Sequence, residues 1–329
     1  MNNFKKIFVL VLACITVASL ASCGKGDNAA TTAPAMMEGA TVAPMEIPDI
    51  DRGEEKIDIA APENASGLAF LKLASDRGYA YNVETKGVTS VSVAEKLKKG
   101  EADIAVVSLE DAAKLSAETD IKILAVNSTL KFSLLENGET LTNVNDLKGK
   151  TVCCGVDDAA SQAVVKAIFS DNGINSELVF VSSAEAETKI KNGEANICIF
   201  SEPDATRIAA ENEGVSKKAD MTAAWKKDYV PIQSCVVVRA DYAEANSEKI
   251  QEFLGHAEIA TNYLVSEAGA GAIAMQLAED GYFSDANLGR DSINACGFVF
   301  IYGEEMQAMV EKYSGFLADN GVEAADIQF

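Results

Sequence analysis

Short apolar runs alternate along this chain with segments of helical periodicity. The runs have the length of β-strands, and several periodic segments end at a glycine, as helices often do. The clearest strands are expected at residues 57–61, 104–107, 151–154 and 197–200, and the clearest helices at residues 68–75 and 161–169. Strands that alternate with helices predict α/β units built on parallel sheets with right-handed crossovers.

An internal repeat divides this pattern into two similar units. Residues 96–114 and 189–207 lie 93 positions apart, and 9 of their 19 residue pairs are identical, including Gly100 with Gly193. The same offset aligns three predicted strands of one unit with three of the other. Two copies of an α/β unit predict two similar α/β lobes.

The remaining segments are expected to complete the two lobes. Two apolar runs supply crossover strands between the lobes, and three helical patterns form a C-terminal region that packs mainly on the first lobe. The crossover runs are residues 130–135 and 233–239, and the helical patterns are residues 247–266, 268–280 and 304–320. The predicted boundaries are residues 54–130 and 240–329 for lobe I, and residues 131–239 for lobe II with the hinge segments.

The first 53 residues differ from the rest in composition. Lys5 and Lys6 precede a 14-residue apolar run and then small residues, which is the layout of a secretory signal and too short for a spanning helix. The segment Leu20-Ala-Ser-Cys23-Gly resembles the bacterial lipobox. We therefore expect a lipoprotein signal peptide at residues 1–22 and a lipidated Cys23, with an ordinary signal peptide as the alternative. Residues 23–53 lack apolar periodicity and are expected to form a flexible tether.

Charge and composition exclude several classes of function. The chain has 50 Asp and Glu against 28 Lys and Arg, a formal net charge of −22, which repels nucleic acid and anionic membrane surfaces. Its single histidine, His256, leaves no residues for a multi-histidine metal site. The cysteines after Cys23 are five in number and have no C-x-x-C spacing, which argues against zinc and against a complete disulfide framework. No metal or cofactor is expected.

The lipobox, the tether, the repeated α/β unit and the helical C-terminal region together resemble the substrate-binding lipoproteins of ABC importers. The nearest resemblance is to the nitrate, sulfonate, taurine and thiamine-precursor branch of the type II periplasmic binding protein fold. Residues 98–108, 145–151, 192–203 and 234–239 carry it. It implies a non-enzymatic receptor, expected to be monomeric, on the extracytoplasmic face of a bacterial membrane. Its implied partners are a small solute, an ABC permease with its ATPase, and the membrane through the lipid on Cys23.

The loops at the carboxyl ends of the strands are the expected ligand site. In open α/β sheets these loops expose free N–H groups where helices begin. The candidates for hydrogen bonds to a solute are Asn64, Ser66, Ser108, Asn127, Asp157, Ser161 and Glu202, and the candidates for stacking on a flat solute are Trp225 and Tyr229. The alternative for the polar candidates is a role as helix N-caps only, and for the aromatic ones simple packing.

The charge of these loops indicates the class of solute. They contain seven acidic residues, the first being Glu63 and the last Asp204, and no lysine or arginine. Capture of a sulfonate or nitrate needs donors or a cation to replace the hydration of the anion. We therefore expect a neutral or cationic organic solute, such as a vitamin precursor or another amine. The alternative is that these acids face solvent and favour helix N-termini, which leaves an anionic solute open.

An enzyme on the same fold is a further alternative, because pyrimidine-precursor synthases resemble these binding proteins. That family relies on a cysteine-rich motif and histidine, whereas this chain has the adjacent pair Cys153 and Cys154 and one histidine. A third possibility is a receptor that presents its solute to a membrane sensor.

Overall fold

The computed structural model describes residues 56–75, 80–279, 284–322 and 329. The predicted signal peptide (residues 1–22), the lipidation site Cys23 and the tether (residues 23–53) lie outside the described residues. All elements below belong to the unit Asp49–Phe329. Among the helices that the structure describes, none has both the length and the apolar character needed to cross a membrane.

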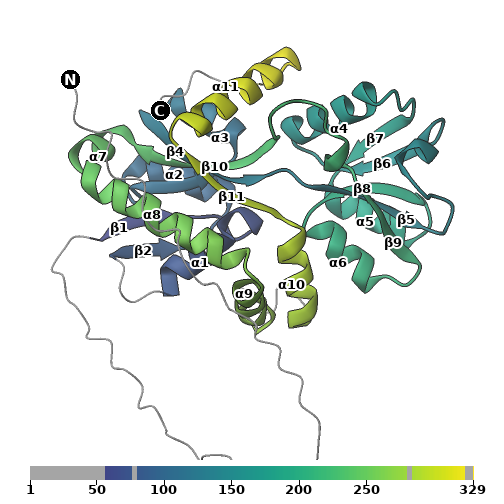
Figure 1. Cartoon of the computed structure of the whole chain (residues 1–329), viewed down its shortest axis with the longest axis horizontal. Coiled ribbons are helices and arrows are strands. Elements are labelled where there is room, and N and C mark those ends of the chain that lie inside the picture. The colour runs from purple at the N-terminus through teal and green to yellow at the C-terminus, as the bar shows by residue number, and fades with distance from the viewer. Residues whose placement is uncertain (1–55, 76–79, 280–283, 323–328) are drawn as a thin grey trace, which may run out of the picture. The chain divides into compact units, whose positions relative to one another are not determined.

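A six-stranded sheet forms the framework of the first lobe (Figure 1). Its strands are β1 (Ile57–Ala60), β2 (Tyr81–Glu84), β3 (Ile104–Val107), β4 (Ile121–Thr129), β10 (Ile232–Arg239) and β11 (Gly297–Tyr302), in the order β11-β4-β10-β3-β1-β2. The connections between the first four strands carry η1 (Ala65–Gly67), α1 (Leu68–Ser75), α2 (Ser90–Lys99) and α3 (Leu109–Ser116). Strand β1 pairs parallel with β2 and β3, whereas β10 runs antiparallel to β3 and β4.

A five-stranded sheet forms the framework of the second lobe. Its strands are β5 (Phe132–Asn137), β6 (Thr151–Gly155), β7 (Glu177–Val181), β8 (Ile197–Ser201) and β9 (Val215–Asp220), in the order β7-β6-β8-β5-β9. The connections carry η2 (Val144–Leu147), α4 (Ala159–Asp171), α5 (Ser183–Lys191) and α6 (Asp204–Glu211). Strand β6 pairs parallel with β7 and β8, and β5 runs antiparallel to β8 and β9.

The two sheets have the same topology, which confirms the prediction of two similar α/β lobes. When β1–β4 are matched to β6–β9 and β10 is matched to β5, the five-strand order is identical in both sheets. Strand β11 is an addition at the edge of the first sheet. The prediction of parallel sheets is wrong for three strands. Strands β10 and β5, which arrive from the crossovers with the other lobe, run antiparallel to their neighbours, and β11 runs antiparallel to β4. Strands β2 and β7 were not predicted, because they are short edge strands whose positions are all exposed or partly exposed.

Two short segments join the lobes, at residues 130–131 between β4 and β5 and at residues 221–231 between β9 and β10. The second segment contains η3 (Thr222–Ala224). Strand β10, which the sequence analysis grouped with the second lobe and its hinge segments, lies in the first sheet because it pairs with β3 and β4.

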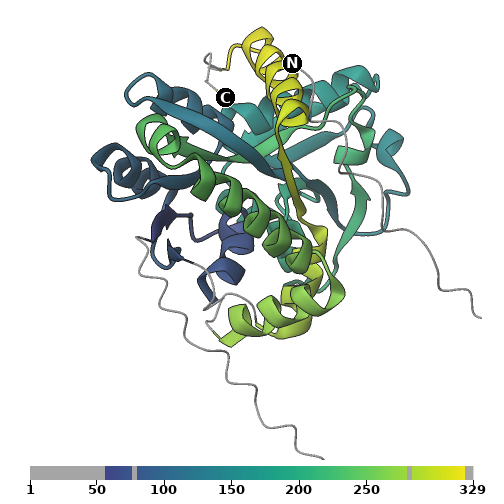
Figure 2. The ribbon, with the colours of Figure 1, turned by 60° about the vertical axis from the view of Figure 1, so that its left-hand side comes forward.

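The C-terminal region adds helices α7 (Ala240–Ala245), α8 (Ser247–Leu264), α9 (Glu267–Glu279), α10 (Ala286–Ala295) and α11 (Glu304–Asp319). Helix α8 lies across one face of the first sheet and packs on α1, as predicted (Figure 2). Helix α10 also contacts α6 of the second lobe. Helix α11 packs on β11 and, through Phe316, on Trp225 in the hinge, with ring centroids 5.2 Å apart. The C-terminal region therefore contacts both lobes.

Alternation along the strands divides the core into layers. In the first sheet, Ala105 and Val107 face the side covered by α2, α3 and α11, and Ile104 and Val106 face the side covered by α1, α8 and α9. Because neighbouring strand residues point to opposite faces, a strand buried on both sides reads as a continuous apolar run. This explains why β3 and β8 were the clearest strands in the sequence.

Side-chain caps fix where the helices start beside the strands. The Thr89 hydroxyl accepts a hydrogen bond from the amide of Ser92, and the Ser92 hydroxyl accepts one from the Thr89 amide, so α2 begins with a capping box. Gly100 ends α2 with a φ of 69°, a left-handed conformation that glycine adopts without steric cost. The side chains of Ser108 and Asp158 likewise cap the N-termini of α3 and α4, and these two helix starts line the site described next.

Candidate functional site

Two adjoining cavities lie where the loops of the two lobes meet. The first, called here the apolar chamber, has a volume of about 490 Å³ and includes Leu68, Leu71 and Leu277 in its lining. The second, called here the serine chamber, has a volume of about 380 Å³ and includes Ser66, Ser90, Ser108, Ser161 and Ser201. Both are lined by Pro62, Asn64, Ser201 and Gln233. Since these residues come from both sheets, the chambers form one interlobe cleft.

The loop after β1 supplies the first wall of the cleft. The Asn64 side-chain oxygen accepts a hydrogen bond of 2.9 Å from the Ser66 amide and so caps η1. The side-chain NH₂ group of Asn64 has no partner among the described residues, and Asn64 is exposed at both chambers. A Cβ at Gly67 would lie 2.1 Å from the carbonyl oxygen of Pro62, so the tight path of this loop requires glycine.

Asn127 supports this loop from behind. It is fully buried, its side-chain NH₂ donates to the Ser66 carbonyl oxygen at 2.8 Å, and its side-chain oxygen accepts from the Ser234 hydroxyl at 2.9 Å. It does not line either chamber. Asn127, predicted to bind the solute directly, therefore holds the loop that carries Asn64 and Ser66.

The starts of α3 and α4 face the serine chamber from opposite lobes. Ser108 caps α3 by accepting from the Asp111 amide at 3.0 Å, and Asp158 caps α4 by accepting from the Ser161 amide at 2.7 Å. A helix N-terminus favours an anion. At α4 that place already holds the Asp158 carboxylate, which lines the chamber together with Ser161. Asp157 is exposed and lines neither chamber.

Glu202 lines the apolar chamber, and both oxygens of its carboxylate accept hydrogen bonds from other residues of the protein. One oxygen accepts from the Ser133 hydroxyl and the Lys217 ammonium, both at 2.6 Å. The other accepts from the amide and the hydroxyl of Thr206, at 3.1 and 2.8 Å. The side chain is 2% exposed. Glu202 therefore fixes the start of α6 and leaves little of its surface to a solute.

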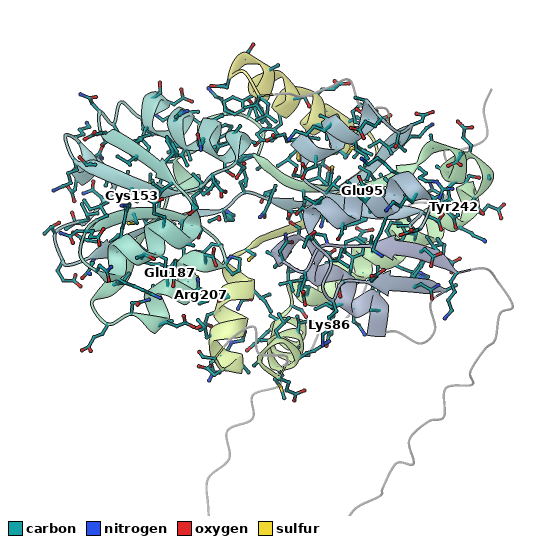
Figure 3. All side chains as sticks on the ribbon, turned by 180° about the vertical axis from the view of Figure 1, so that it is seen from behind. Lys86, Glu95, Cys153, Glu187, Arg207 and Tyr242 are labelled. Atoms are coloured by element: carbon teal, nitrogen blue, oxygen red, sulfur yellow. The ribbon has the colours of Figure 1, made fainter. Side chains whose placement is uncertain are left out.

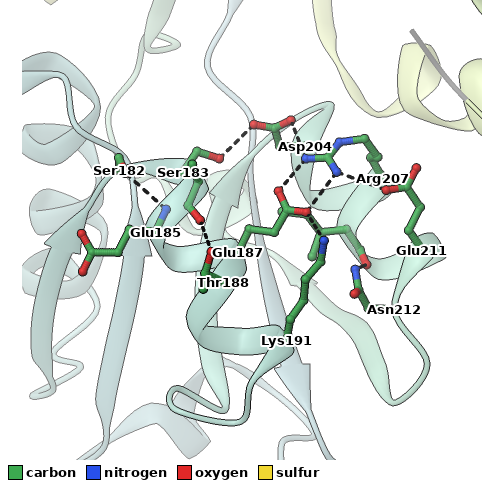
Figure 4. Close-up of polar contacts among 12 residues, drawn as sticks. Ser182, Ser183, Glu185, Glu187, Thr188, Lys191, Asp204, Arg207, Glu211 and Asn212 are labelled. Atoms are coloured by element: carbon green, nitrogen blue, oxygen red, sulfur yellow. Dashed lines mark hydrogen bonds and ion pairs between the residues drawn. The ribbon is translucent and has the colours of Figure 1, made fainter. Parts of the chain in front are cut away.

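Arg207 is the positively charged side chain that α6 brings to the apolar chamber, and three carboxylates bind it (Figure 4). Its two terminal nitrogens lie 2.8 and 3.2 Å from the oxygens of Glu187, and 3.4 and 3.2 Å from Asp204 and Glu211. The Arg207 guanidinium lowers the pKa of Glu187 to about 2. Because its charge is already neutralised, Arg207 is a poor binder of a solute anion.

Two lysines also reach the cleft lining. Lys114 pairs with Glu110 at 2.8 Å. Lys86 lines the apolar chamber and has no ion pair or hydrogen bond with another described residue. Figure 3 shows Lys86 and Arg207 on different lobes. The lining as a whole carries six carboxylates (Glu63, Glu110, Asp111, Asp158, Glu202 and Asp204) and three cations (Lys86, Lys114 and Arg207), so the cleft is acidic.

Trp225 and Tyr229 lie in the hinge and line neither chamber. The indole N–H of Trp225 donates to the carbonyl oxygen of Tyr229 at 2.6 Å, and the two rings meet edge to face with centroids 6.0 Å apart. Both line a separate cavity of about 410 Å³ beside the hinge segments. The structure therefore gives these two residues a packing role and does not bring them to the cleft.

The cysteines and the histidine lie away from the cleft. Cys153 and Cys154 point to opposite faces of the second sheet, as adjacent residues of a strand do, and both are buried. The Nδ1 atom of His256 lies 2.7 Å from the hydroxyl of Tyr81. None of these residues lines either chamber. They therefore do not form a cysteine–histidine site in the cleft.

Two further cleft residues, Gln233 and Tyr313, were also missed by the sequence analysis. Gln233 lines both chambers, and its side-chain amide has no partner among the described residues. Gln233 could have been predicted from the sequence, because it is a polar residue near the start of a largely apolar strand. Tyr313 of α11 lines the serine chamber. It had no sequence signal, because it lies on the apolar side of its helix like an ordinary core residue.

Comparisons with known proteins agree with this architecture. The periplasmic aliphatic sulphonate binding protein SsuA from Escherichia coli has a similar structure, with a TM-score of 0.65 and 17% identity over 83% of this chain and 91% of that chain. An ABC transporter from Parabacteroides distasonis has a TM-score of 0.64 and 17% identity over 83% of this chain and 97% of that chain. A Candida albicans gene product described as having the generic periplasmic binding protein fold has a TM-score of 0.50 and 14% identity over 82% of this chain and 92% of that chain.

These likenesses, with the two matching sheets and the cleft, show that the chain has the periplasmic binding protein fold. The family described as NMT1/THI5 like matches residues 80–268, which is more than half of the chain. The protein therefore belongs to the NMT1/THI5-like family. No curated protein matches the chain.

Proposed function

We propose that this protein is the solute-binding component of an ABC importer. It captures a small organic solute between its lobes and delivers it to a permease and ATPase. The observation that carries this proposal is the interlobe cleft, whose chambers are lined by residues from two sheets of identical topology. Only two short segments join the sheets, which suits a hinge that closes on a ligand. The solute-binding proteins among the structural neighbours support the same function.

The proposed anchoring rests on the sequence alone. The lipobox at Cys23 and the polar segment after it support a lipoprotein tethered to the extracytoplasmic face of the membrane, where it meets its permease. We propose that it works there as a monomer. Metabolic labelling with a radioactive fatty acid tests this assignment: wild-type protein incorporates the label, and the Cys23→Ala variant does not.

We further propose that the solute is neutral or cationic, as an amine or a vitamin precursor would be. The acidic lining, the Asp158 carboxylate at the start of α4 and the neutralised Arg207 all disfavour a buried anion. The proposed contacts with the solute are Asn64, Ser66, Ser108 and Ser161, with Gln233 added from the structure.

An anionic solute is the second candidate, because one structural neighbour is an aliphatic sulphonate binding protein and Lys86 lines the apolar chamber without a partner among the described residues. A thermal-shift screen separates the two. We expect amines to raise the unfolding temperature, and taurine, alkanesulfonates and nitrate to leave it unchanged. Stabilisation by those anions alone would contradict the assignment of solute charge.

Native mass spectrometry of protein purified from cells tests the proposed function itself. We expect a fraction of the protein to carry an unmodified small molecule that is released on unfolding. A bound molecule that the purified protein converts into a product would instead indicate an enzyme. Protein that retains no molecule and responds to none in the screen would contradict the receptor function.

A further inference from the structure

The Tyr313 hydroxyl is a buried polar group without a partner at the edge of the cleft. Tyr313 is 0% exposed, and its phenol oxygen makes no hydrogen bond. The described residues contain two other buried side-chain oxygens of this kind, on Ser216 and Ser292, and neither of those residues lines a chamber. Buried polar groups in native proteins almost always have a partner. The exception at Tyr313 therefore indicates a group that arrives from outside the chain.

The surroundings of Tyr313 indicate the chemistry of that group. The serine chamber also holds Glu110, Asp111 and Asp158, against the single cation Lys114. Lys114 is 2.8 Å from Glu110 and 4.0 Å from Asp111, so its charge is shared by these two. Asp158 has no cationic partner, and its Oδ2 atom accepts no hydrogen bond from the described residues. This chamber therefore offers free acceptors and excess negative charge.

The protonation state of Tyr313 fits the same chemistry. Burial raises its pKa far above the ordinary value, and the carboxylates of Asp158 and Glu110 raise it further. The hydroxyl is therefore neutral at physiological pH, with a lone pair free to accept a hydrogen bond. Both residues line the serine chamber, and a solute ammonium has several N–H donors for acceptors of this kind. An anionic group would instead face three carboxylates.

The apolar chamber differs from the serine chamber in the character of its lining. Leu68, Leu71 and Leu277 line it, and its volume of about 490 Å³ is large enough for a hydrocarbon or ring portion of a small ligand. The side-chain NH₂ group of Asn64 and the side-chain amide of Gln233, which have no partner among the described residues, lie where the two chambers adjoin. The cleft thus has a polar acidic end and an apolar end.

We propose that the serine chamber is a subsite for the nitrogen-bearing head of an amphiphilic solute, with Tyr313 and Asp158 as its contacts, and that the apolar chamber holds the uncharged remainder. This inference rests on the proposed solute-binding function. Tyr313 comes from lobe I and Asp158 from lobe II, so the head group links the lobes. Because water does not reach Tyr313 in the conformation described, contact with the solute accompanies a movement of the lobes. Helix α11 is linked to the segment that joins the lobes, because Lys312 of α11 pairs with Asp228 at 2.7 Å. We therefore expect α11 to move with that segment.

Isothermal titration calorimetry with three six-carbon probes tests the subsite: hexylamine, 1-hexanol and hexanesulfonate. We expect hexylamine to bind most tightly and hexanesulfonate not to bind. The Tyr313→Phe and Asp158→Asn variants should each weaken hexylamine binding about tenfold, the effect of losing one hydrogen bond to a charged group. Glu194→Gln is the matched control, because it removes an exposed lobe II carboxylate outside both chambers; it should stay within about twofold of wild type.

Stability separates a binding role from a structural one. Tyr313→Phe removes an unpartnered hydroxyl, so its unfolding temperature should equal or exceed that of the wild type. The inference is overturned if hexanesulfonate binds more tightly than hexylamine, if both variants bind hexylamine like the wild type, or if no hexylamine binds at about 10 mM. If native mass spectrometry still finds a retained solute in these cases, the receptor function is supported and only the subsite proposal is rejected. If no solute is retained and no probe binds, both the receptor function and the subsite proposal are rejected.

Discussion

Replacing Glu187 by Gln removes the charge that holds α5 to α6. Glu187 of α5 is 17% exposed and binds both terminal nitrogens of Arg207 on α6, and Lys191 adds a second ion pair. Arg207 also contacts Asp204, whose other oxygen accepts from the Ser183 hydroxyl at 2.9 Å. The network therefore stabilises the helix that begins at the lobe II wall of the cleft.

The size of the effect follows from the pKa of Glu187, which falls from its ordinary 4.5 to about 2, chiefly through the hydrogen bonds from Arg207. At about 1.4 kcal/mol per pH unit this lowering corresponds to about 3 kcal/mol. Solvent screens a partly exposed pair, so we expect Glu187→Gln to lower the free energy of unfolding by about 2 kcal/mol at pH 7.

The effect depends on pH in a defined direction. Since the pKa is lower in the folded state, the stabilisation is complete above the unfolded value of about 4.5 and is lost as the pH falls toward about 2. Urea unfolding followed by circular dichroism at pH 7, 5 and 3 should show a difference between wild type and variant that shrinks at pH 3.

The matched control is Glu185→Gln on the same helix. Glu185 is 52% exposed and pairs with Lys189 at 3.3 Å, so its loss should cost less than about 0.5 kcal/mol. Equal stability of Glu187→Gln and wild type at pH 7, or a difference that does not change between pH 7 and pH 3, would refute the reasoning.

Three further outcomes are expected. Asn127→Ala removes two buried hydrogen bonds and should cost about 3 kcal/mol in urea unfolding; a loss below about 1 kcal/mol would contradict its supporting role. Gly155→Ala places a Cβ 2.8 Å from the ring of Phe200 and should cost about 1–3 kcal/mol by the same measurement, and an unchanged midpoint would show that the ring can move away. Burial raises the pKa of Cys154 and Cys235 to about 12, so iodoacetamide at about pH 8 should leave both unmodified in the folded protein; peptide mass mapping that finds either alkylated would count against this.

Much of the fold was predictable because its signals are local. The 93-residue repeat and the continuous apolar runs of β3 and β8 predicted two similar lobes, and the matching sheet orders confirm them. Gly100 and Gly193 were expected to end helices, and both have the left-handed φ that this position requires. The antiparallel direction of β10 and β5 was not predictable in this way, because strand direction depends on which partner a strand meets after the chain crosses between lobes.

The site, like the fold, has some features that the local sequence predicts and others that only tertiary packing decides. Strand ends followed by helix starts placed Ser108 and Ser161 at the cleft, because the carboxyl edge of a parallel sheet is fixed by chain direction. The sequence by itself thus determined the duplicated sheets and the place of the cleft. Tertiary structure alone decided that Glu202 is occupied by Lys217, that Arg207 is neutralised, and that Tyr313 reaches the serine chamber from a helix far along the chain. Periodicity reports only which face of an element is apolar, whereas the partner of a buried charge or hydroxyl is set by packing between segments distant in sequence.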